Sequence, residues 1–502
     1  MEVLPALRSQ LDRYLAACNG QRHRYLAGLS TQLSLCAAHE AFPIFSDPAS
    51  FFALHERYLA SGTSEAQRPL MLPWMRFLWE QLLDAKSAVP QEEIAALEAQ
   101  QRPVLSEEES PWREVEVKLV REPSAERRAL MEAAQANFLL AHKGPYARRR
   151  ERSHAALALI HCSSFRELRQ RLEVEETPAA DCEALLKSTD DAYADLLCFY
   201  LKRLDPSLKS LPHGRAGLWD LKRVAQTPWL ASLLAPGESL PALDRCLTAL
   251  GFHPTAEGYV QREVHERVGK TASAQPLPIG VPEEIRLLCR IQTGGHAEYF
   301  GLFRASAEAL RLGHLPGDSR VETRRLGDPT ALQAWGLVFG QLLTCEGFYR
   351  RFLTLSKPMA REIARVSAFL CLAGFREAVG RRLCADAAES DAPSGTLADS
   401  FVQRTQSALR VTVSRGRFLQ DAWPLQRPHQ ELQAWALAAL ITQKLERDFQ
   451  EDFFRNPACG TWLKQQWRSP EREDAGTVAK QLSETPPSLA EAAARLIRVM
   501  GA

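Results

Sequence analysis

Apolar residues at helical spacing fill most of this sequence and leave one stretch with the pattern of a sheet. The helical patterns are separated by stop signals such as Asn19-Gly20 and Pro90. Residues 256–292 differ, because EGYVQREVHERVGK alternates and IRLLCRI is a short apolar run before two glycines. Trp112 to Arg121 fits a strand or a helix equally well. We therefore predict a mostly α-helical fold with one small β-sheet.

The composition is typical of a soluble globular protein. With 502 residues, 45% hydrophobic residues and a formal charge of +1, the chain is long enough for two or three lobes. This near-neutral charge argues against a nucleic-acid partner or a membrane surface, and we interpret the basic run YARRRER at 146–152 as a solvated helix face. The eleven cysteines form no C-x-x-C pair. We expect reduced thiols in a cytoplasmic protein without a signal peptide or a membrane-spanning segment.

The stretch QTGGHAEYFGLFRASAE begins at Gln292 and is followed by GDPTALQAWGLVFGQLL. From its spacing, the first stretch predicts a glycine turn that opens an amphipathic helix over 297–313, and the second predicts a helix over 330–345. Arg304 and Glu308 are four residues apart on the first helix and opposite in charge. Such a pair commonly forms a solvated ion pair on a helix surface.

The order of a strand, a Gly-Gly turn, this helix and the next resembles the zinc site of the thimet oligopeptidase and oligoendopeptidase F metallopeptidases. In that family the turn is followed by x-x-x-Y-x-x-L-F-H-E-x-x-H and, about one helix later, by a Glu. Here AEYFGLF matches the start of the motif, and the resemblance extends over most of the chain. It implies two helical lobes around a deep channel, residues 1–205 and 206–502, with the sheet of 256–292 beside the former zinc-site helix.

The residues that carry the chemistry of this motif are replaced. Arg304 stands at the first zinc-binding His, Ala305 at the catalytic Glu, Glu308 at the second His and Gln333 at the third ligand. An arginine stays protonated at any accessible pH and cannot bind a metal ion. We hypothesise that Arg304 replaces the charge of the metal, with Glu308 and Gln333 as its hydrogen-bond acceptors. We expect no metal and no other cofactor.

The resemblance also implies which other residues line the binding channel. His296 and Tyr299 lie at the start of the former zinc-site helix. The segment ELQAW, from Glu431 to Trp435, resembles a Tyr-Leu-Arg-Ala-Trp pattern on a later helix, with Glu431 in place of a Tyr that helps to stabilise an oxyanion. The sheet edge at 285–291 is expected to present its backbone to an extended peptide.

A metal site built from neighbouring residues is disfavoured. The residues within reach in sequence are His296, Glu298, Glu308, His314 and Glu322. His296 and His314 lie at opposite ends of one helix, about 27 Å apart, and Arg304 would repel a cation between them. A phosphate-binding loop at Gly-Lys-Thr 269–271 is also excluded, because its first glycine would fall on Val264.

Three functions remain open. The first is an inactive peptidase-like protein that binds a peptide or a partner protein in its channel. The second is an enzyme that uses the channel for non-zinc chemistry in a biosynthetic pathway, with Glu308, Glu431 or His429 as acid or base. The third, an active peptidase with a relocated metal site, is disfavoured because H-E-x-x-H and H-x-x-E-H are absent. Hydrogen bonds from Arg304 to both Glu308 and Gln333 would favour the first, and a free carboxylate with a raised pKa would favour the second.

Overall fold

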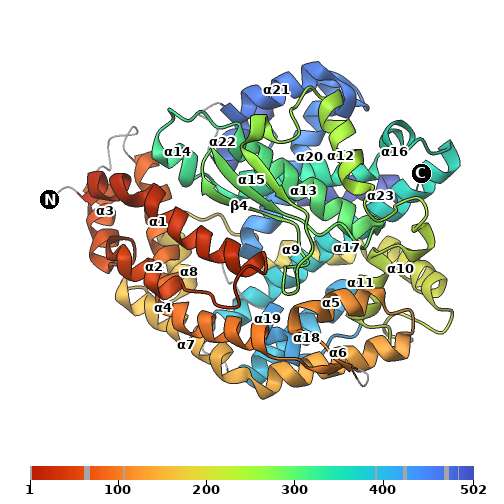
Figure 1. The fold of residues 1–502 in the computed structure, drawn as a ribbon, viewed down its shortest axis with the longest axis horizontal. Helices are drawn as coiled ribbons and strands as arrows, with labels where there is room; N and C mark the ends of the chain where they lie inside the picture. Colours follow the sequence, from red (N-terminus) through yellow and green to blue (C-terminus); the bar gives the residue numbers. More distant parts are fainter. Residues whose placement is uncertain are drawn as a thin grey trace.

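The computed structural model describes residues 3–60, 68–105, 108–390, 393–421, 427–468, 474–483 and 485–501. Within these ranges the chain is mostly helical and contains a three-stranded sheet, as the sequence predicts. A small two-stranded hairpin joins β1 (Val104–Leu105) to β2 (Glu108–Glu109). Figure 1 shows the two chain ends at opposite sides of the molecule.

The helices before residue 205 are drawn in red to yellow in Figure 1, with the first four at the left and α5 to α7 along the lower edge. Their bounds are α1 (Val3–Leu26), α2 (Leu35–Ala41), α3 (Pro48–Ala60), α4 (Arg68–Gln100), α5 (Trp112–Arg121), α6 (Ala125–Ala141), α7 (Lys143–Leu159), α8 (Phe165–Arg171), α9 (Ala179–Ser188) and α10 (Asp190–Leu204). The long helices α4 and α7 pack along each other.

Two predicted helix stops lie inside helices. Helix α1 continues past Asn19, whose side chain donates to the Pro278 carbonyl oxygen (2.9 Å) instead of capping a helix end. Helix α4 continues through Pro90, which has no N–H for the Lys86 carbonyl four residues earlier. Arg152 of α7 donates to that carbonyl at 3.5 Å. Contacts with distant parts of the chain therefore override both local signals.

The segment that fitted a strand or a helix equally well forms helix α5. Trp112, Val115 and Leu119 are buried at spacings of three and four residues, so they share one face of the helix. The intervening sequence also alternates apolar and charged residues. Packing against the neighbouring helices α6 and α11 therefore decides between the two periods.

The remaining helices follow along the chain to the C-terminus. Their bounds are α11 (Leu218–Ala225), α12 (Ser239–Ala249), α13 (Gly295–Gly313), α14 (Val321–Arg325), α15 (Pro329–Gly340), α16 (Glu346–Phe352), α17 (Lys357–Ala388), α18 (Ser394–Leu409), α19 (Phe418–Asp421), α20 (Arg427–Phe449), α21 (Pro457–Arg468), α22 (Ala475–Leu482) and α23 (Leu489–Gly501). Helix α15 packs between α13 and α20.

The sheet lies beside α13, in the region that the sequence predicts. Its strands are β3 (Val260–Glu263), β4 (Gln275–Gly280) and β5 (Glu284–Leu288), in the order β3-β5-β4. Strand β5 is parallel to β3 and antiparallel to β4. The predicted edge at 285–291 is therefore wrong, because β5 is the central strand and its backbone is paired on both sides.

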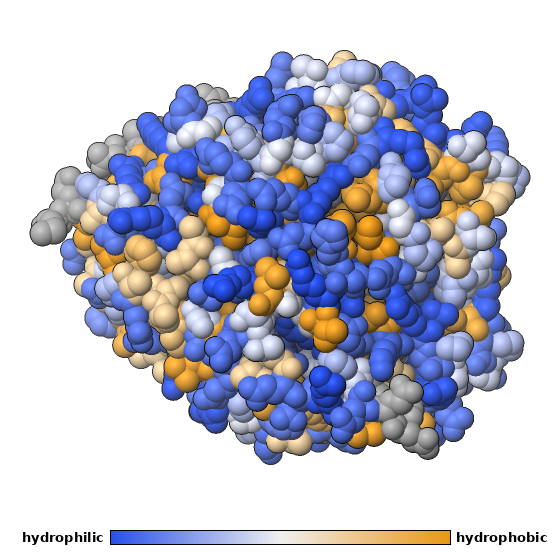
Figure 2. Space-filling model, in the orientation of Figure 1, coloured by the Kyte–Doolittle hydropathy of each residue, from blue (hydrophilic) through white to orange (hydrophobic). Residues whose placement is uncertain are grey.

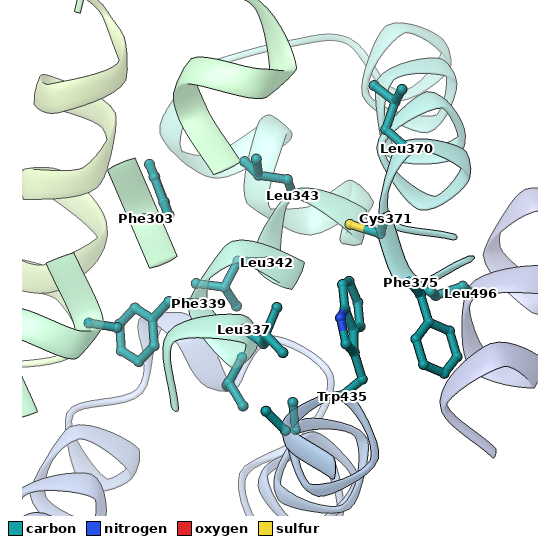
Figure 3. Close-up of a cluster of buried hydrophobic side chains, with 14 of the residues drawn as sticks. Phe303, Leu337, Phe339, Leu342, Leu343, Leu370, Cys371, Phe375, Trp435 and Leu496 are labelled. Atoms are coloured by element: carbon teal, nitrogen blue, oxygen red, sulfur yellow. The ribbon is translucent and has the colours of Figure 1, made fainter. Parts of the chain in front are cut away.

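Two large hydrophobic cores contain most of the buried apolar residues, and two smaller clusters accompany them. One contains residues from Leu7 to Leu172 together with Ala388, and the other contains residues from Cys182 to Met500. Helices α9 and α10 thus pack with the C-terminal elements, and the division into lobes at residue 205 remains a prediction. Figure 3 shows part of the larger core, where side chains from α13, α15, α17, α20 and α23 meet.

The molecular surface is predominantly polar on the face seen in Figure 2, where hydrophobic residues form small, scattered groups. Among the helices of the described ranges, none combines the length and the apolar character needed to cross a bilayer.

Candidate functional site

A glycine turn sets the start of α13, as predicted. Gly294 and Gly295 have φ of +61° and +72°, a conformation that side chains rarely adopt. A Cβ on Gly295 would also lie 2.0 Å from the carbonyl oxygen of Gln226. The carboxylate of Glu298 accepts hydrogen bonds from the N–H groups of Thr293 and Gly294, both at 2.8 Å. Glu298 therefore fixes the turn and is already bound.

Helix α13 crosses α15 at two glycines of α15. A Cβ on Gly336 would lie 2.6 Å from Oε1 of Glu308 and 2.9 Å from Cγ of Arg304. A Cβ on Gly340 would lie 2.8 Å from the ring of Phe300. Phe300, Arg304 and Glu308 are spaced by four residues and share the face toward α15. The structure thus brings Arg304 and Glu308 together at the predicted helix pair.

The predicted cluster of hydrogen bonds around Arg304 does not form. Nε of Arg304 lies 4.0 Å from Oε1 of Glu308, which is too long for a hydrogen bond. The Arg304 side chain is 38% exposed and that of Glu308 is 10% exposed, so the guanidinium faces solvent while the carboxylate lies inside. Gln333 is half-buried near the start of α15, and no hydrogen bond joins it to Arg304 in the part of the chain that the structure describes. Ala305 is fully buried.

Glu308 is a buried carboxylate with no hydrogen-bond donor at Oε1. Burial raises its pKa to about 7, and the nearby charge of Arg304 opposes this shift only in part. The group therefore changes its charge near neutral pH. Oε1 itself packs against the backbone of Gly336, so this oxygen faces helix α15 and not an open space.

The substitution Glu308→Gln is expected to remove a pH dependence of stability. The pKa of Glu308 is raised from 4.5 to about 7 in the folded protein, so the folded state binds more protons than the unfolded state between these values. The protonated Glu308 therefore stabilises the fold below the unfolded-state pKa of 4.5. As the pH rises through the folded-state pKa of about 7, the free energy of unfolding falls by about 3 kcal/mol. In urea unfolding, the free energy of unfolding of the Gln variant should increase relative to that of the parent between about pH 5 and about pH 8.

Glu451→Gln, at an exposed position, is the matched control and should follow the parent at both pH values. If Glu308→Gln also follows the parent, Glu308 ionises normally and the buried position does not raise its pKa.

The two residues predicted at the start of the channel helix are buried. His296 is 5% exposed, its ring stacks on Phe300 with centroids 5.6 Å apart, and its Nε2 has no hydrogen-bond partner. Burial lowers the pKa of His296 to about 3, so the ring is neutral. Tyr299 has no exposed surface and its hydroxyl has no partner, and burial raises its pKa. Neither side chain is accessible to a ligand in solvent.

The residues predicted on the later helix, α20, are bound or buried by other parts of the protein. Glu431 forms an ion pair with Arg381 of α17 at 2.6 Å. Trp435 is 4% exposed and packs on Phe375 in the core, with ring centroids 5.2 Å apart (Figure 3). His429 is fully buried with no partner for either ring nitrogen, and burial, together with two nearby arginines, lowers its pKa to about 3. It is therefore a neutral imidazole.

The residues present do not fit the zinc ion of the resembling peptidases. Arg304 carries a positive charge, and Glu308, the only acidic side chain among the residues that the resemblance aligns with the zinc ligands, turns one oxygen toward α15. His314 uses Nδ1 to donate to the Leu310 carbonyl (2.8 Å), and Glu322 accepts from Trp74 (3.0 Å). No group of three His, Cys, Asp or Glu residues in the described ranges is arranged to hold a metal ion.

Strand β4 is an edge of the sheet, and its backbone is blocked. Pro276 and Pro278 have no N–H to donate. The Pro278 carbonyl accepts from Asn19 of α1 (2.9 Å) and from Arg325 of α14 (3.2 Å), and the Ile279 carbonyl accepts from Arg325 (3.0 Å). Two N–H groups of β4 are thus absent, and the carbonyl oxygens of Pro278 and Ile279 are already bound, so this part of the edge is unsuited to an added strand.

Ion pairs hold α1 and α14 together over this edge. Asp12 of α1 accepts from Arg325 at 2.5 Å and from Arg324 at 3.1 Å, and Arg8 pairs with Glu322 at 2.6 Å. The Arg325 side chain is only 3% exposed. Helices α1 and α14 are therefore held over β4 by packed contacts of the folded protein.

Lys270 has a structural use that the sequence did not reveal. Its ammonium group is fully buried and donates to the carbonyl oxygens of Glu263 (2.6 Å), His265 (2.9 Å) and Cys289 (2.8 Å). It ties the segment after β3 to the end of β5. A lysine in a polar stretch has the sequence signature of a surface residue, so no signal in the sequence marks it as buried.

The fold is similar to several solved peptidases. PZ peptidase A with an inhibitor aligns with a TM-score of 0.65, at 11% identity, over 99% of this chain and 91% of that one. A Pyrococcus furiosus carboxypeptidase aligns with a TM-score of 0.54, at 10% identity, over 99% and 98% of the two chains. This chain has a metallopeptidase fold. At such low identity the likeness establishes the fold alone.

The peptidase fold extends over the whole chain. Metallocarboxypeptidase 1 of Trypanosoma cruzi aligns with a TM-score of 0.52, at 10% identity, over 98% of this chain and 99% of that one. The sequence matches no family model, and no curated protein is similar to it in sequence. The predicted peptidase-like fold is thus confirmed, whereas membership of the thimet oligopeptidase and oligoendopeptidase F family remains a prediction.

Proposed function

We propose that this chain is a non-hydrolytic protein of the metallopeptidase fold, and that it acts by binding a peptide or a partner protein. The proposal rests on the helix pair α13 and α15, where the resemblance aligns Arg304 with a metal ligand and the structure places Arg304 beside Glu308. Ala305, at the position of the general base, has no group that accepts a proton. Peptide hydrolysis through metal-bound water is therefore unsupported by these side chains.

The blocked edge of β4 narrows the mode of binding. An extended peptide that adds to a sheet needs free N–H and carbonyl groups along the edge strand. Asn19 and Arg325 occupy the Pro278 carbonyl, and two prolines remove donors. We infer that the partner does not add as a strand at β4. All eleven cysteines are free thiols, which supports a reducing compartment such as the cytoplasm.

A second candidate is an enzyme that uses Glu308 as an acid or base without a metal. The observation that favours it is a buried carboxylate whose Oε1 accepts no hydrogen bond and whose pKa is about 7, a value suited to proton transfer at neutral pH. Among the described residues, Arg304 makes no hydrogen bond to Glu308 or Gln333, and this also favours the second candidate. The contact between Oε1 and the Gly336 backbone opposes it, since that oxygen faces the neighbouring helix.

The test is metal content by elemental analysis, combined with a mixed peptide library that is incubated with the protein and then sorted into bound, cleaved and unbound fractions. We expect no stoichiometric zinc, and intact peptides in the bound fraction. One zinc per chain, with cleavage that a chelator abolishes, would overturn the proposal. Peptides that are neither bound nor cleaved would overturn the peptide-binding part. Cleavage without metal that Glu308→Gln abolishes would establish the second candidate.

A further inference from the structure

A cavity of about 500 Å³ lies between helices α9 and α18, with α17 beneath it. Its lining residues are Glu183, Leu186, Lys187, Asp190, Leu211, Pro212, Arg376, Leu383, Arg404, Gln406, Ser407 and Arg410. None of them belongs to α13 or α15, so the cavity is separate from the helix pair of the peptidase motif. Its volume falls within the range of small-molecule sites.

The lining carries an excess of positive charge. Arg376, Arg410 and Asp190 form one group, since the two carboxylate oxygens of Asp190 accept from Arg376 at 3.0 Å and from Arg410 at 3.1 Å. Arg404 is neutralised by Glu183 at 3.0 Å. Lys187 forms no ion pair within the described residues and is exposed. A concave site with unbalanced cations attracts anions.

Arg376 makes the floor of the cavity rigid. It is 1% exposed and donates to the carbonyl oxygens of Ala408 (2.7 Å) and Leu186 (2.8 Å) and to the hydroxyl of Thr189 (2.5 Å). These bonds join α17 to the end of α18 and to the end of α9. The cations at the mouth are therefore mounted on elements that are fixed relative to one another, which lowers the entropy cost of binding.

Arg410 has a backbone conformation that favours glycine. It follows the last residue of α18 with φ +53° and ψ 31°, the left-handed conformation in which helix ends usually carry glycine. A non-glycine residue costs on the order of 1 kcal/mol there. Its carbonyl accepts from the N–H of Leu211 at 2.9 Å, and glycine would make the same bond. The strained residue thus contributes only its guanidinium, at the mouth of the cavity.

We propose that this cavity binds a small organic anion with a carboxylate or phosphate group. The anionic group contacts Lys187 and Arg410, and the apolar part of the ligand lies against Leu211, Pro212 and Leu383. Mixed lining of this kind, apolar with a few convergent charges, is typical of specific small-molecule sites. The inference goes beyond the binding function proposed above and does not rest on it, because Arg304 and Glu308 take no part in this cavity.

Isothermal titration calorimetry tests the proposal with two organic anions, phenyl phosphate and benzoate. Inorganic phosphate tests the contribution of the charge alone, and phenol tests that of the apolar ring alone. We expect one site per chain for phenyl phosphate or benzoate, with a Kd below about 1 mM that weakens as salt is added. The tighter of the two identifies the anionic group. Binding of inorganic phosphate as tight as that of phenyl phosphate overturns the organic part, and no saturable binding of either organic anion overturns the whole.

Two pairs of variants locate the site. Arg410→Gly relieves the left-handed strain, so it should fold at least as well as the parent while weakening the tighter probe about tenfold. Gln450→Gly is its control, because Gln450 is also left-handed (φ +74°) and lies outside the cavity. Lys187→Ala should weaken binding about threefold, and Lys202→Ala should not. Unchanged affinity in Arg410→Gly, with Gln450→Gly also unchanged, overturns the assignment to this cavity.

Discussion

Replacing Lys270 with methionine is expected to destabilise the protein by about 4 kcal/mol. The ammonium group donates to three carbonyl oxygens, those of Glu263, His265 and Cys289, and the Lys270 residue itself has no exposed surface. Methionine has a similar length and fills the space, so the loss comes from the hydrogen bonds and not from a cavity. The carbonyl oxygens would be left without their charged donor in a buried site.

Urea unfolding of Lys270→Met measures this loss, and hydrogen exchange of the β3 and β5 amides locates it. The exposed lysine of α10 provides the control, since Lys202→Met should leave both the midpoint and the exchange rates unchanged. A midpoint for Lys270→Met equal to that of the control would mean that the three bonds contribute little to the folded state.

Arg128→Met is expected to cost a similar amount, about 4 kcal/mol. The Arg128 side chain has no exposed surface, and its Nε and Nη2 donate to Oδ1 of Asp220 at 2.9 Å and 2.7 Å. Its Nη1 donates to the carbonyl oxygens of Glu122 and Pro123, both at 2.8 Å. The arginine thus joins the start of α6 to α11. Its removal leaves Asp220 as a buried carboxylate without its counter-charge.

A double-mutant cycle separates the charge pair from simple packing. Asp220 also accepts from the N–H of Gly217 at 2.8 Å, and Asp220→Asn keeps an oxygen for that bond. In the double variant Arg128→Met with Asp220→Asn, the buried charge is gone, so the combined loss in urea unfolding should be smaller than the sum of the single losses. Additive losses would show that the two side chains are not coupled.

The sequence predicts the helical fold and the sheet region because both depend on local periodicity. The prediction of helix ends fails where a residue distant in sequence makes the hydrogen bond that a local stop signal leaves open. Asn19 and Pro90 carry strong local stop signals, but the Asn19 side chain is bound to the Pro278 carbonyl and Arg152 serves the carbonyl that Pro90 leaves free. Neither Pro278 nor Arg152 is close in sequence to the residue that it contacts.

At the candidate site, spacing predicts which residues meet but not how they meet. Helical spacing correctly places Arg304 and Glu308 on one face, toward the second helix. It does not show that Gly336 lets α15 approach so closely that the carboxylate is buried while the guanidinium stays at the surface. The burial of Trp435 and His429 is hidden for the same reason, since it depends on the packing of α20 against α17.

The closed edge of β4 has a consequence for the solution behaviour of the chain. A peptidase that holds its substrate as an added strand must leave a row of backbone groups unpaired, and such a row also receives strands from other unfolded or damaged chains. Here two prolines, Asn19 and Arg325 remove that row. The contacts that keep an added peptide strand from this part of β4 therefore also remove a template for aggregation.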